Sequence, residues 1–196
     1  MKAVRFGMAL QTLKLGAVLA LGFAPAAVSA QDGHGAAHSS PTPATALTSA
    51  FAREVRQATV RFLDPNVALN EGYVPTFGCV TGSSEGAMGI HFVNMNKVGN
   101  PGLEIGDPEI LLYEPLPGNR LRLTGVDYLV LADAWNAANP APPELAGQLF
   151  HYFETPNRFG LPAFYTLHVW AWKDNPQGTF ANWNPNVSCD AYNPQN

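Results

Sequence analysis

Hydrophobic residues recur at helical spacing in one long stretch of the chain, residues 47–63. The residues that share this spacing of three or four positions are Leu47, Phe51, Val55, Ala58 and Phe62. Such spacing places them on one face of a helix. Asp64-Pro65-Asn66 follows, and a proline cannot continue the helical hydrogen-bond ladder. The pattern predicts one amphipathic helix over 47–63 and a second, short helix over 67–71 that ends at Gly72.

Beyond residue 72 the apolar residues come in short runs that are typical of strands and are separated by turn residues. The runs that predict strands are 89–94, 109–114, 120–131, 149–153 and 164–172. The segment Pro115–Asn119 has the composition of a turn, so the strands on either side of it are expected to pair as a hairpin. A parallel β-α-β arrangement is not expected, because only one helix is long enough for the crossover.

The last predicted strand carries apolar side chains on both of its faces. Successive residues point to opposite sides of a strand, so Leu167 and Val169 share one face while His168, Trp170 and Trp172 share the other. A sheet with one solvated face would show polar residues on that side. We therefore expect an α+β fold with the N-terminal helix packed on a curved antiparallel sheet or small open β-barrel. We expect the other face of the sheet to fold round on itself or to be capped by residues 132–162.

The first thirty residues have the features of a secretory signal peptide. Lys2, Arg5 and Lys14 supply positive charge, a short apolar run follows, and Val28-Ser29-Ala30 forms a small-residue cleavage site. The apolar run is shorter than the roughly 20 residues of a membrane-spanning helix. The sequence thus predicts a signal peptide over 1–30, a disordered linker over 31–46 and a single globular domain over 47–196. We expect an exported protein, periplasmic or secreted.

The charge balance limits the classes of partner. The chain has 11 Lys and Arg against 15 Asp and Glu, a formal net charge of −4, which falls to −7 when the three bases of the signal peptide are removed. An acidic surface argues against nucleic acid and anionic lipid as partners. We expect no membrane span in the mature chain, and a small molecule is the partner class left open.

Two cysteines, Cys79 and Cys189, are the only ones in the chain. An isolated pair in an exported protein predicts one disulfide. The alternative is a pair of thiols that bind a metal, but two lone cysteines lack the C-x-x-C spacing of a zinc site.

Six blocks of sequence follow one another across most of residues 65–189. They are Gly86–His91, Pro108–Pro115, Gly125–Tyr128, Leu167–Trp172, Asn175–Phe180 and Asn184–Cys189. Together they resemble a family of small, uncharacterised exported bacterial proteins. The resemblance implies export and the size of a single domain, and it implies neither an activity nor a site residue.

Two histidines, His91 and His168, stand in the middle of predicted strands among apolar residues. An imidazole is costly to bury unless it bonds to something. Two histidines with a carboxylate, Glu114 or Asp127, would suit a divalent transition metal, a small polar ligand or general acid–base chemistry. The alternative is that each histidine makes a structural hydrogen bond.

Strand parity relates the two histidines to each other. If Ile90 and Phe92 pack under the helix together with Leu167, then His91 and His168 must both emerge on the opposite, concave face. A one-residue bulge in either strand would reverse this expectation, because every side chain would change face.

A second hypothesis is a non-catalytic binder of an apolar small molecule. Tyr113, Tyr128, Trp170 and Trp172 could line its pocket, and the same residues would equally serve a packed core. A third hypothesis is a structural envelope protein with an exposed apolar patch and no cavity. Whether the protein is an enzyme stays open at this point.

Overall fold

A computed structural model describes residues 43–194, which belong to one compact unit spanning residues 40–196. The predicted signal peptide and residues 31–42 of the predicted linker lie outside the described residues. Residues 43–46, which we expected to belong to the linker, form the start of the first helix instead.

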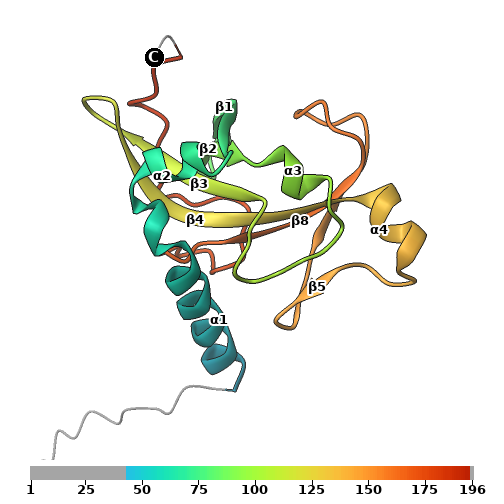
Figure 1. Cartoon of the computed structure of the whole chain (residues 1–196). Helices are drawn as coiled ribbons and strands as arrows, with labels where there is room; N and C mark the ends of the chain where they lie inside the picture. The colour runs from blue at the N-terminus through green and yellow to red at the C-terminus, as the bar shows by residue number, and fades with distance from the viewer. Residues whose placement is uncertain (1–42, 195–196) are drawn as a thin grey trace, which may run out of the picture. The chain divides into compact units, whose positions relative to one another are not determined.

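The N-terminal part of this unit is helical (Figure 1). Helix α1 covers Pro43–Thr59 and continues into a single 3-10 turn over Val60–Leu63, so the predicted helix begins four residues earlier and tightens at its end. Helix α2 covers Pro65–Asn70. Asp64 caps it, because its Oδ1 accepts a hydrogen bond of 2.9 Å from the backbone N–H of Asn66. The short helices α3 (Met95–Val98) and α4 (Ala132–Ala138) were not predicted.

Six strands form an antiparallel sheet in the order β1-β2-β3-β4-β8-β7. Their bounds are Val74–Thr81 (β1), Ala87–Val93 (β2), Ile110–Leu116 (β3), Arg120–Leu131 (β4), Phe164–Val169 (β8) and His151–Phe153 (β7). A separate ladder pairs β5 (Glu144–Leu145) with β6 (Gln148–Leu149). The predicted hairpin is confirmed as the pair β3–β4.

Strand β1 was not predicted from the sequence. It contains Pro75 and Gly78, and only Val80 within it is fully buried. It is an edge strand, where a proline need not interrupt the hydrogen bonds to a neighbour. A bulge at Phe77 and Gly78, with φ values of 67° and 68°, further breaks the alternation of its side chains.

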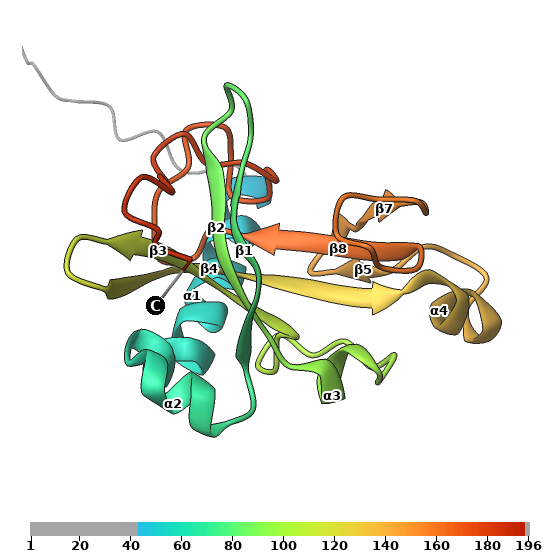
Figure 2. The same cartoon turned by 90° about the horizontal axis from the view of Figure 1, so that it is seen from above.

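The sheet is apolar on both faces, as the sequence predicts. Helix α1 packs on one face, where Phe51 and Val55 join a cluster that includes Ile90, Phe92 and Leu167. The cluster on the other face includes Val93, Ile110, Leu112, Leu129, Phe164 and Trp170, with Phe159 and Leu161 from the loop after β7 packed against it. The α+β fold with a helix on a curved antiparallel sheet is therefore confirmed. The sheet curls into a half-barrel, and the β1–β2 ribbon runs across the direction of β4 and β8 (Figure 2).

The predicted disulfide is confirmed. Cys79 of β1 is bonded to Cys189, with their Cα atoms 5.8 Å apart. The bond attaches the segment that follows β8 to the first strand of the sheet. A backbone bridge between Ala87 and Asn184 fixes the same segment against β2.

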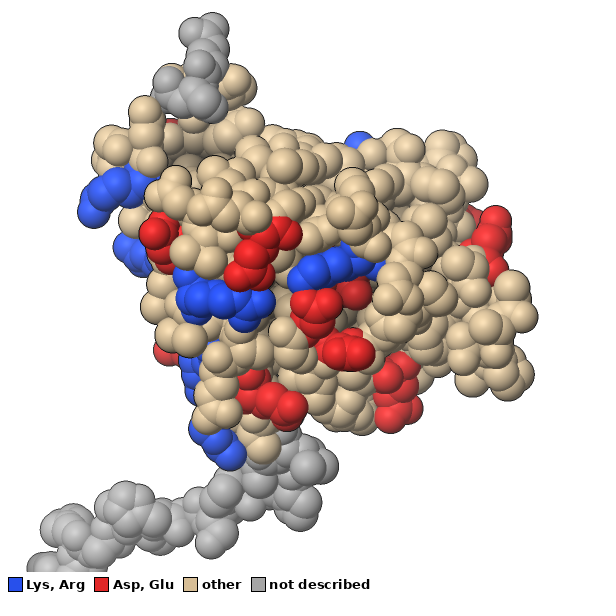
Figure 3. All heavy atoms as spheres, viewed as in Figure 1, with Lys and Arg blue, Asp and Glu red and all other residues tan. Residues whose placement is uncertain are grey.

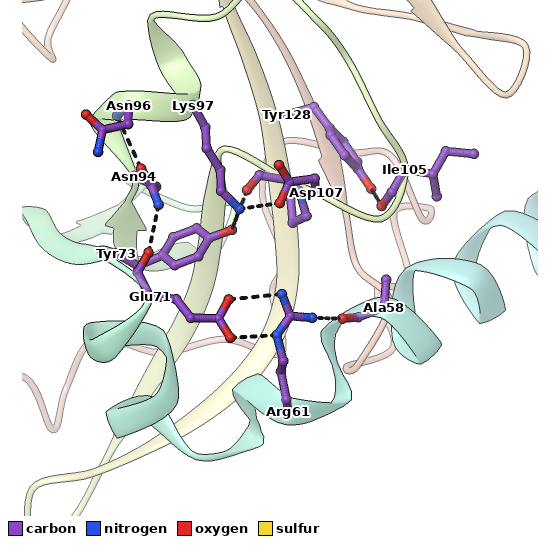
Figure 4. A network of polar contacts seen from close by, with 11 residues as sticks. Ala58, Arg61, Glu71, Tyr73, Asn94, Asn96, Lys97, Ile105, Asp107 and Tyr128 are labelled. Atoms are coloured by element: carbon purple, nitrogen blue, oxygen red, sulfur yellow. Dashed lines mark hydrogen bonds and ion pairs between the residues drawn. The ribbon is translucent and has the colours of Figure 1, made fainter.

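A polar network holds the loop between α3 and β3 (Figure 4). The hydroxyl of Tyr73 donates to the carbonyl of Pro108 and accepts from Lys97, each at 2.7 Å, and Lys97 also pairs with Asp107. On the face of the molecule seen in Figure 3, basic side chains lie beside acidic ones in the same way. Several acidic side chains on this face therefore have a basic neighbour.

Glu109 is the buried carboxyl of this region. It is 2% exposed, and its Oε2 accepts a hydrogen bond of 3.0 Å from the backbone N–H of Leu129. Burial raises the pKa of Glu109 from its ordinary value of 4.5 to about 8. Between about pH 4.5 and pH 8, Glu109 is protonated in the folded protein but ionised in the unfolded chain. The free energy of unfolding therefore falls as the pH rises through this window, and Glu109 changes it little above about pH 8.

We predict that Glu109→Gln removes this pH dependence, because the amide does not ionise. Between pH 7 and pH 8 the wild-type protein should lose about 1 kcal/mol of stability relative to the variant. Urea unfolding of both proteins at the two pH values measures the difference. Parallel changes in the two proteins would contradict the prediction.

Candidate metal centre

The structure brings His91, Asp127 and His168 together on the face of the sheet opposite α1. They come from β2, β4 and β8, and each offers one ligand atom that lies within 4.8 Å of those of the other two. Each residue is only 3% exposed. The predicted parity is confirmed, because Ile90 and Phe92 lie in the cluster under α1. The two histidines therefore share the opposite face.

The curl of the sheet is what brings the histidines near each other. Strands β3 and β4 lie between β2 and β8, so in a flat sheet the two backbones would be about 14 Å apart, at about 4.8 Å per strand. The ring centroids of His91 and His168 are 6.1 Å apart. The side chains can converge in this way only if the sheet bends toward them, so this face is the concave one.

Two glycines allow the strands to approach closely around this bend. A Cβ atom on Gly125 of β4 would lie 2.4 Å from the carbonyl oxygen of Val169 in β8. A Cβ atom on Gly89 of β2 would lie 2.5 Å from the carbonyl oxygen of Tyr113, and Gly89 has a φ of 91°. Both distances are shorter than real Cβ contacts allow, so any other residue would push the strands apart.

Asp127 and His168 face each other directly across β4 and β8. His168 Nδ1 lies 3.5 Å from Asp127 Oδ1. Despite this short distance the nitrogen makes no hydrogen bond, and burial keeps the imidazole of His168 neutral at neutral pH. Two ligands of one tetrahedral ion, with bonds of about 2.0–2.1 Å, lie about 3.3 Å apart. The observed separation therefore fits two ligands of one ion better than a hydrogen-bonded pair.

The imidazoles are short of hydrogen-bond partners. Among the described residues, Nδ1 of His91 and both ring nitrogens of His168 are buried without one. A neutral imidazole has one donor and one acceptor, and leaving a buried polar group unpaired costs about 1–3 kcal/mol. These nitrogens are therefore available to a further hydrogen-bond partner or ligand.

Burial also sets the protonation of the three side chains. It lowers the pKa of His91 to about 4, assisted by the neighbouring His168, and that of His168 to about 3. Burial raises the pKa of Asp127 to about 6, although His91 and the hydroxyl of Thr166, which donates to the carboxylate, act in the opposite direction. At neutral pH the site offers two neutral imidazoles and a carboxylate, the states in which these groups bind metals.

Glu114, the other carboxylate considered from the sequence, lies outside this cluster. Its two oxygens accept hydrogen bonds of 2.8 and 2.7 Å from Lys173, and one of them also accepts a bond of 3.2 Å from the backbone N–H of Ser188. Glu114 therefore pairs with a cation and anchors the C-terminal segment. His151, exposed on β7, is also outside the cluster.

Tyr113 and Tyr128, which we considered as pocket residues, are part of the core under α1. The hydroxyl of Tyr113 donates to the carbonyl of Phe62 at 2.6 Å, and that of Tyr128 donates to the carbonyl of Ile105 at 2.7 Å. Their polar atoms are thus satisfied by the backbone, as in a packed core.

Trp170 and Trp172 do not share a face as the strand pattern suggests. Trp170 packs in the cluster on the concave side. Strand β8 ends at Val169, so the alternation does not extend to Trp172, which packs against the α1 side and donates to the hydroxyl of Thr59 at 2.9 Å. Neither tryptophan lines the cavity beside the histidines.

That cavity has a volume of about 20 Å³, which is room for about one water molecule. Besides the three site residues, its wall includes Phe77, Leu129, Phe153, Phe159, Phe164 and Thr166. Sequence reasoning placed Phe164 on the same face as His168 but did not find Phe77 or Phe159. Phe77 lies on the unpredicted edge strand and Phe159 in a loop, where no periodicity marks a residue as lining a site.

We predict that His168→Leu stabilises the metal-free protein by about 1 kcal/mol, because it removes two unpaired buried nitrogens at similar volume. Thr166→Val on the same face is the matched control. It should destabilise the protein, because it takes a hydrogen-bond donor from Asp127. Urea unfolding in the presence of a chelator measures both. Equal losses in the two variants would show that the His168 nitrogens are satisfied.

Comparison with known proteins gives no relative, since no family model, no curated protein and no solved structure matches the chain. In residues 43–194, none of the helices has the length and apolar character needed to cross a bilayer. What can be inferred about function therefore depends on the geometry of the site itself.

Proposed function

We propose that this protein binds a divalent transition metal ion through His91, Asp127 and His168. The observation that carries the proposal is the group of buried, unpaired imidazole nitrogens around one carboxylate, with ligand atoms within 4.8 Å of one another. Imidazole nitrogen with carboxylate oxygen suits zinc and other first-row transition metals. Magnesium and calcium prefer oxygen ligands throughout.

A bound ion would give the two imidazoles and the carboxylate of the site a common partner. It would accept the lone pairs of the imidazoles, and the carboxylate of Asp127 would balance one of its two charges. Thr166 already donates to Asp127, and such hydrogen bonds from outside the ligand set hold a ligand in orientation. A modest movement of the His91 ring is enough to complete the set, since its ligand atom lies within 4.8 Å of the others.

The size of the cavity favours an ion over an organic ligand. A volume of about 20 Å³ holds one water-sized group. Pockets that bury drug-sized apolar molecules are far larger, on the order of 300–1,000 Å³. At this cavity the metal site is therefore preferred to an apolar ligand.

We also propose that the protein acts outside the cytoplasm, in the periplasm or as a secreted protein. The proposal rests on the signal-like features of residues 1–30 and on the disulfide between Cys79 and Cys189. Disulfides persist in oxidising compartments.

We predict that the protein, once stripped with a chelator, binds one equivalent of Zn²⁺ or Co²⁺. His91→Ala, Asp127→Asn and His168→Ala should each lower the affinity by at least about 100-fold, because each removes a direct ligand, and even indirect contacts are worth 10–100-fold. Calorimetric titration and elemental analysis measure affinity and stoichiometry. His151→Ala is the comparison variant, since this exposed histidine supplies no ligand atom and acts on Asp127 and His168 only through its charge, so its removal should change the affinity far less than loss of a ligand. Substoichiometric binding, or binding that survives all three ligand variants, would overturn the proposal.

The pH dependence of the affinity gives a second prediction. Below about pH 6 the affinity should fall about tenfold per pH unit, because one proton competes for Asp127, whose pKa is about 6. The histidines, with pKa values of about 4 and 3, should add to the loss only at lower pH. Dissociation constants at pH 7, 6 and 5 measure the slope. A loss approaching a thousandfold per unit at pH 5 would indicate that both histidines have ordinary pKa values.

A further inference from the structure

Two phenylalanines close the cavity on the side of His91, and we call them the aromatic closure. Phe77 lies in the bulge of β1 at a φ of 67° and is 37% exposed, and Phe159 lies in the loop after β7. Their ring centroids are 5.4 Å apart, and each is 6.3 Å from that of His91. Since β1 and β7 are the two edges of the sheet, the aromatic closure spans the open side of the half-barrel.

A cation lies over the aromatic closure. The guanidinium of Arg158 is 5.8 Å from the ring centroid of Phe159 and 5.8 Å from that of Trp183. Within residues 43–194 its hydrogen bonds are long, at 3.4 and 3.5 Å to the carbonyl of Thr81. Its charge acts on His91 in the direction that lowers the pKa of the imidazole. Arg158 therefore contributes a positive charge near the His91 side of the cavity.

An ion held by the three ligands would keep one uncompensated positive charge. Asp127 supplies a single negative charge and both imidazoles are neutral. The hydroxyl of Thr166, which also lines the cavity, is already bonded to Asp127. A net charge in such an apolar, buried space is costly. One additional negative charge would bring the site to neutrality.

The space beside the ligands limits the size of any further group. Three protein ligands leave at least one coordination position open on a transition metal. A transition-metal ion held between the ligand atoms would take only a small part of the cavity of about 20 Å³, which leaves room for one small donor beside the ion. Phe77 and Phe159 both line the cavity, so a planar ring would have to displace one of them to reach the ligand atoms.

We propose that the open coordination position binds one small monoanion, of the class of hydroxide or azide, which passes the aromatic closure and is attracted by Arg158. This inference rests on the metal binding proposed above. It assigns Phe77 and Phe159 to size selection and Arg158 to the attraction of the anion.

The test uses the full mature protein loaded with Co²⁺, whose metal content is measured first by elemental analysis. Azide and imidazole are then titrated separately at constant ionic strength while the visible absorption of the cobalt is followed. Azide should change the spectrum and saturate at one equivalent per cobalt. Imidazole should leave the spectrum unchanged in the wild-type protein.

Three variants separate size selection from charge. Phe159→Ala should admit imidazole while still binding azide, and Phe77→Ala provides a second opening if the first fails to fold. Arg158→Gln should slow azide association by about two- to tenfold, with the difference shrinking at high salt. Arg53→Gln, on the far side of the sheet in α1, is its matched control and should leave the rate unchanged.

The outcomes distinguish the two proposals. A protein that loads cobalt fully but does not respond to azide, or that responds equally to imidazole, overturns the anion site and leaves the metal site standing. A protein that does not load cobalt overturns both. An azide response that is insensitive to Arg158→Gln and to both phenylalanine variants overturns the assigned route.

Discussion

Histidines on β2 and β8, which have two strands between them in the sheet, approach to 6.1 Å between ring centroids. That distance requires the sheet to bend strongly toward one face. The close contacts at Gly89 and Gly125 allow this bend, and α1 fills the convex side. The disulfide from Cys79 attaches the C-terminal segment to the edge strand. The small cavity, its aromatic wall and the cluster of possible ligands all result from this curvature.

The buried polar groups fall into two kinds. Glu114 pairs with Lys173, and Glu109 accepts a hydrogen bond from the backbone of Leu129, so both are satisfied within the protein. His168, equally buried, has no partner for either nitrogen among the described residues. Natural proteins commonly give up stability at functional sites. The contrast between satisfied and unsatisfied groups on one sheet distinguishes His168 from the two buried carboxyl groups, which have partners within the protein.

The sequence by itself determined the features that depend on local periodicity and on residue chemistry. The spacing of Phe51, Val55 and Phe62 defined the long helix, and the turn after Pro115 defined the β3–β4 hairpin. The alternation of side chains in two strands placed His91 and His168 on one face. These inferences succeeded because a side chain's direction follows from the backbone geometry of its own element.

Only the tertiary structure decided features that depend on strand order, register and curvature. It selected Asp127 rather than Glu114 as the carboxylate beside the histidines, because the β4–β8 register sets Asp127 opposite His168. The edge strand β1 could not be predicted, because its bulge and its proline interrupt the alternation of side chains. The contact between Phe77 and Phe159, which come from opposite edges of the sheet, also appears only in the folded protein. The end of strand β8 at Val169, before Trp172, likewise appears only in the tertiary structure. Contacts between residues far apart in the chain leave no local pattern, because they arise only when the sheet closes on itself.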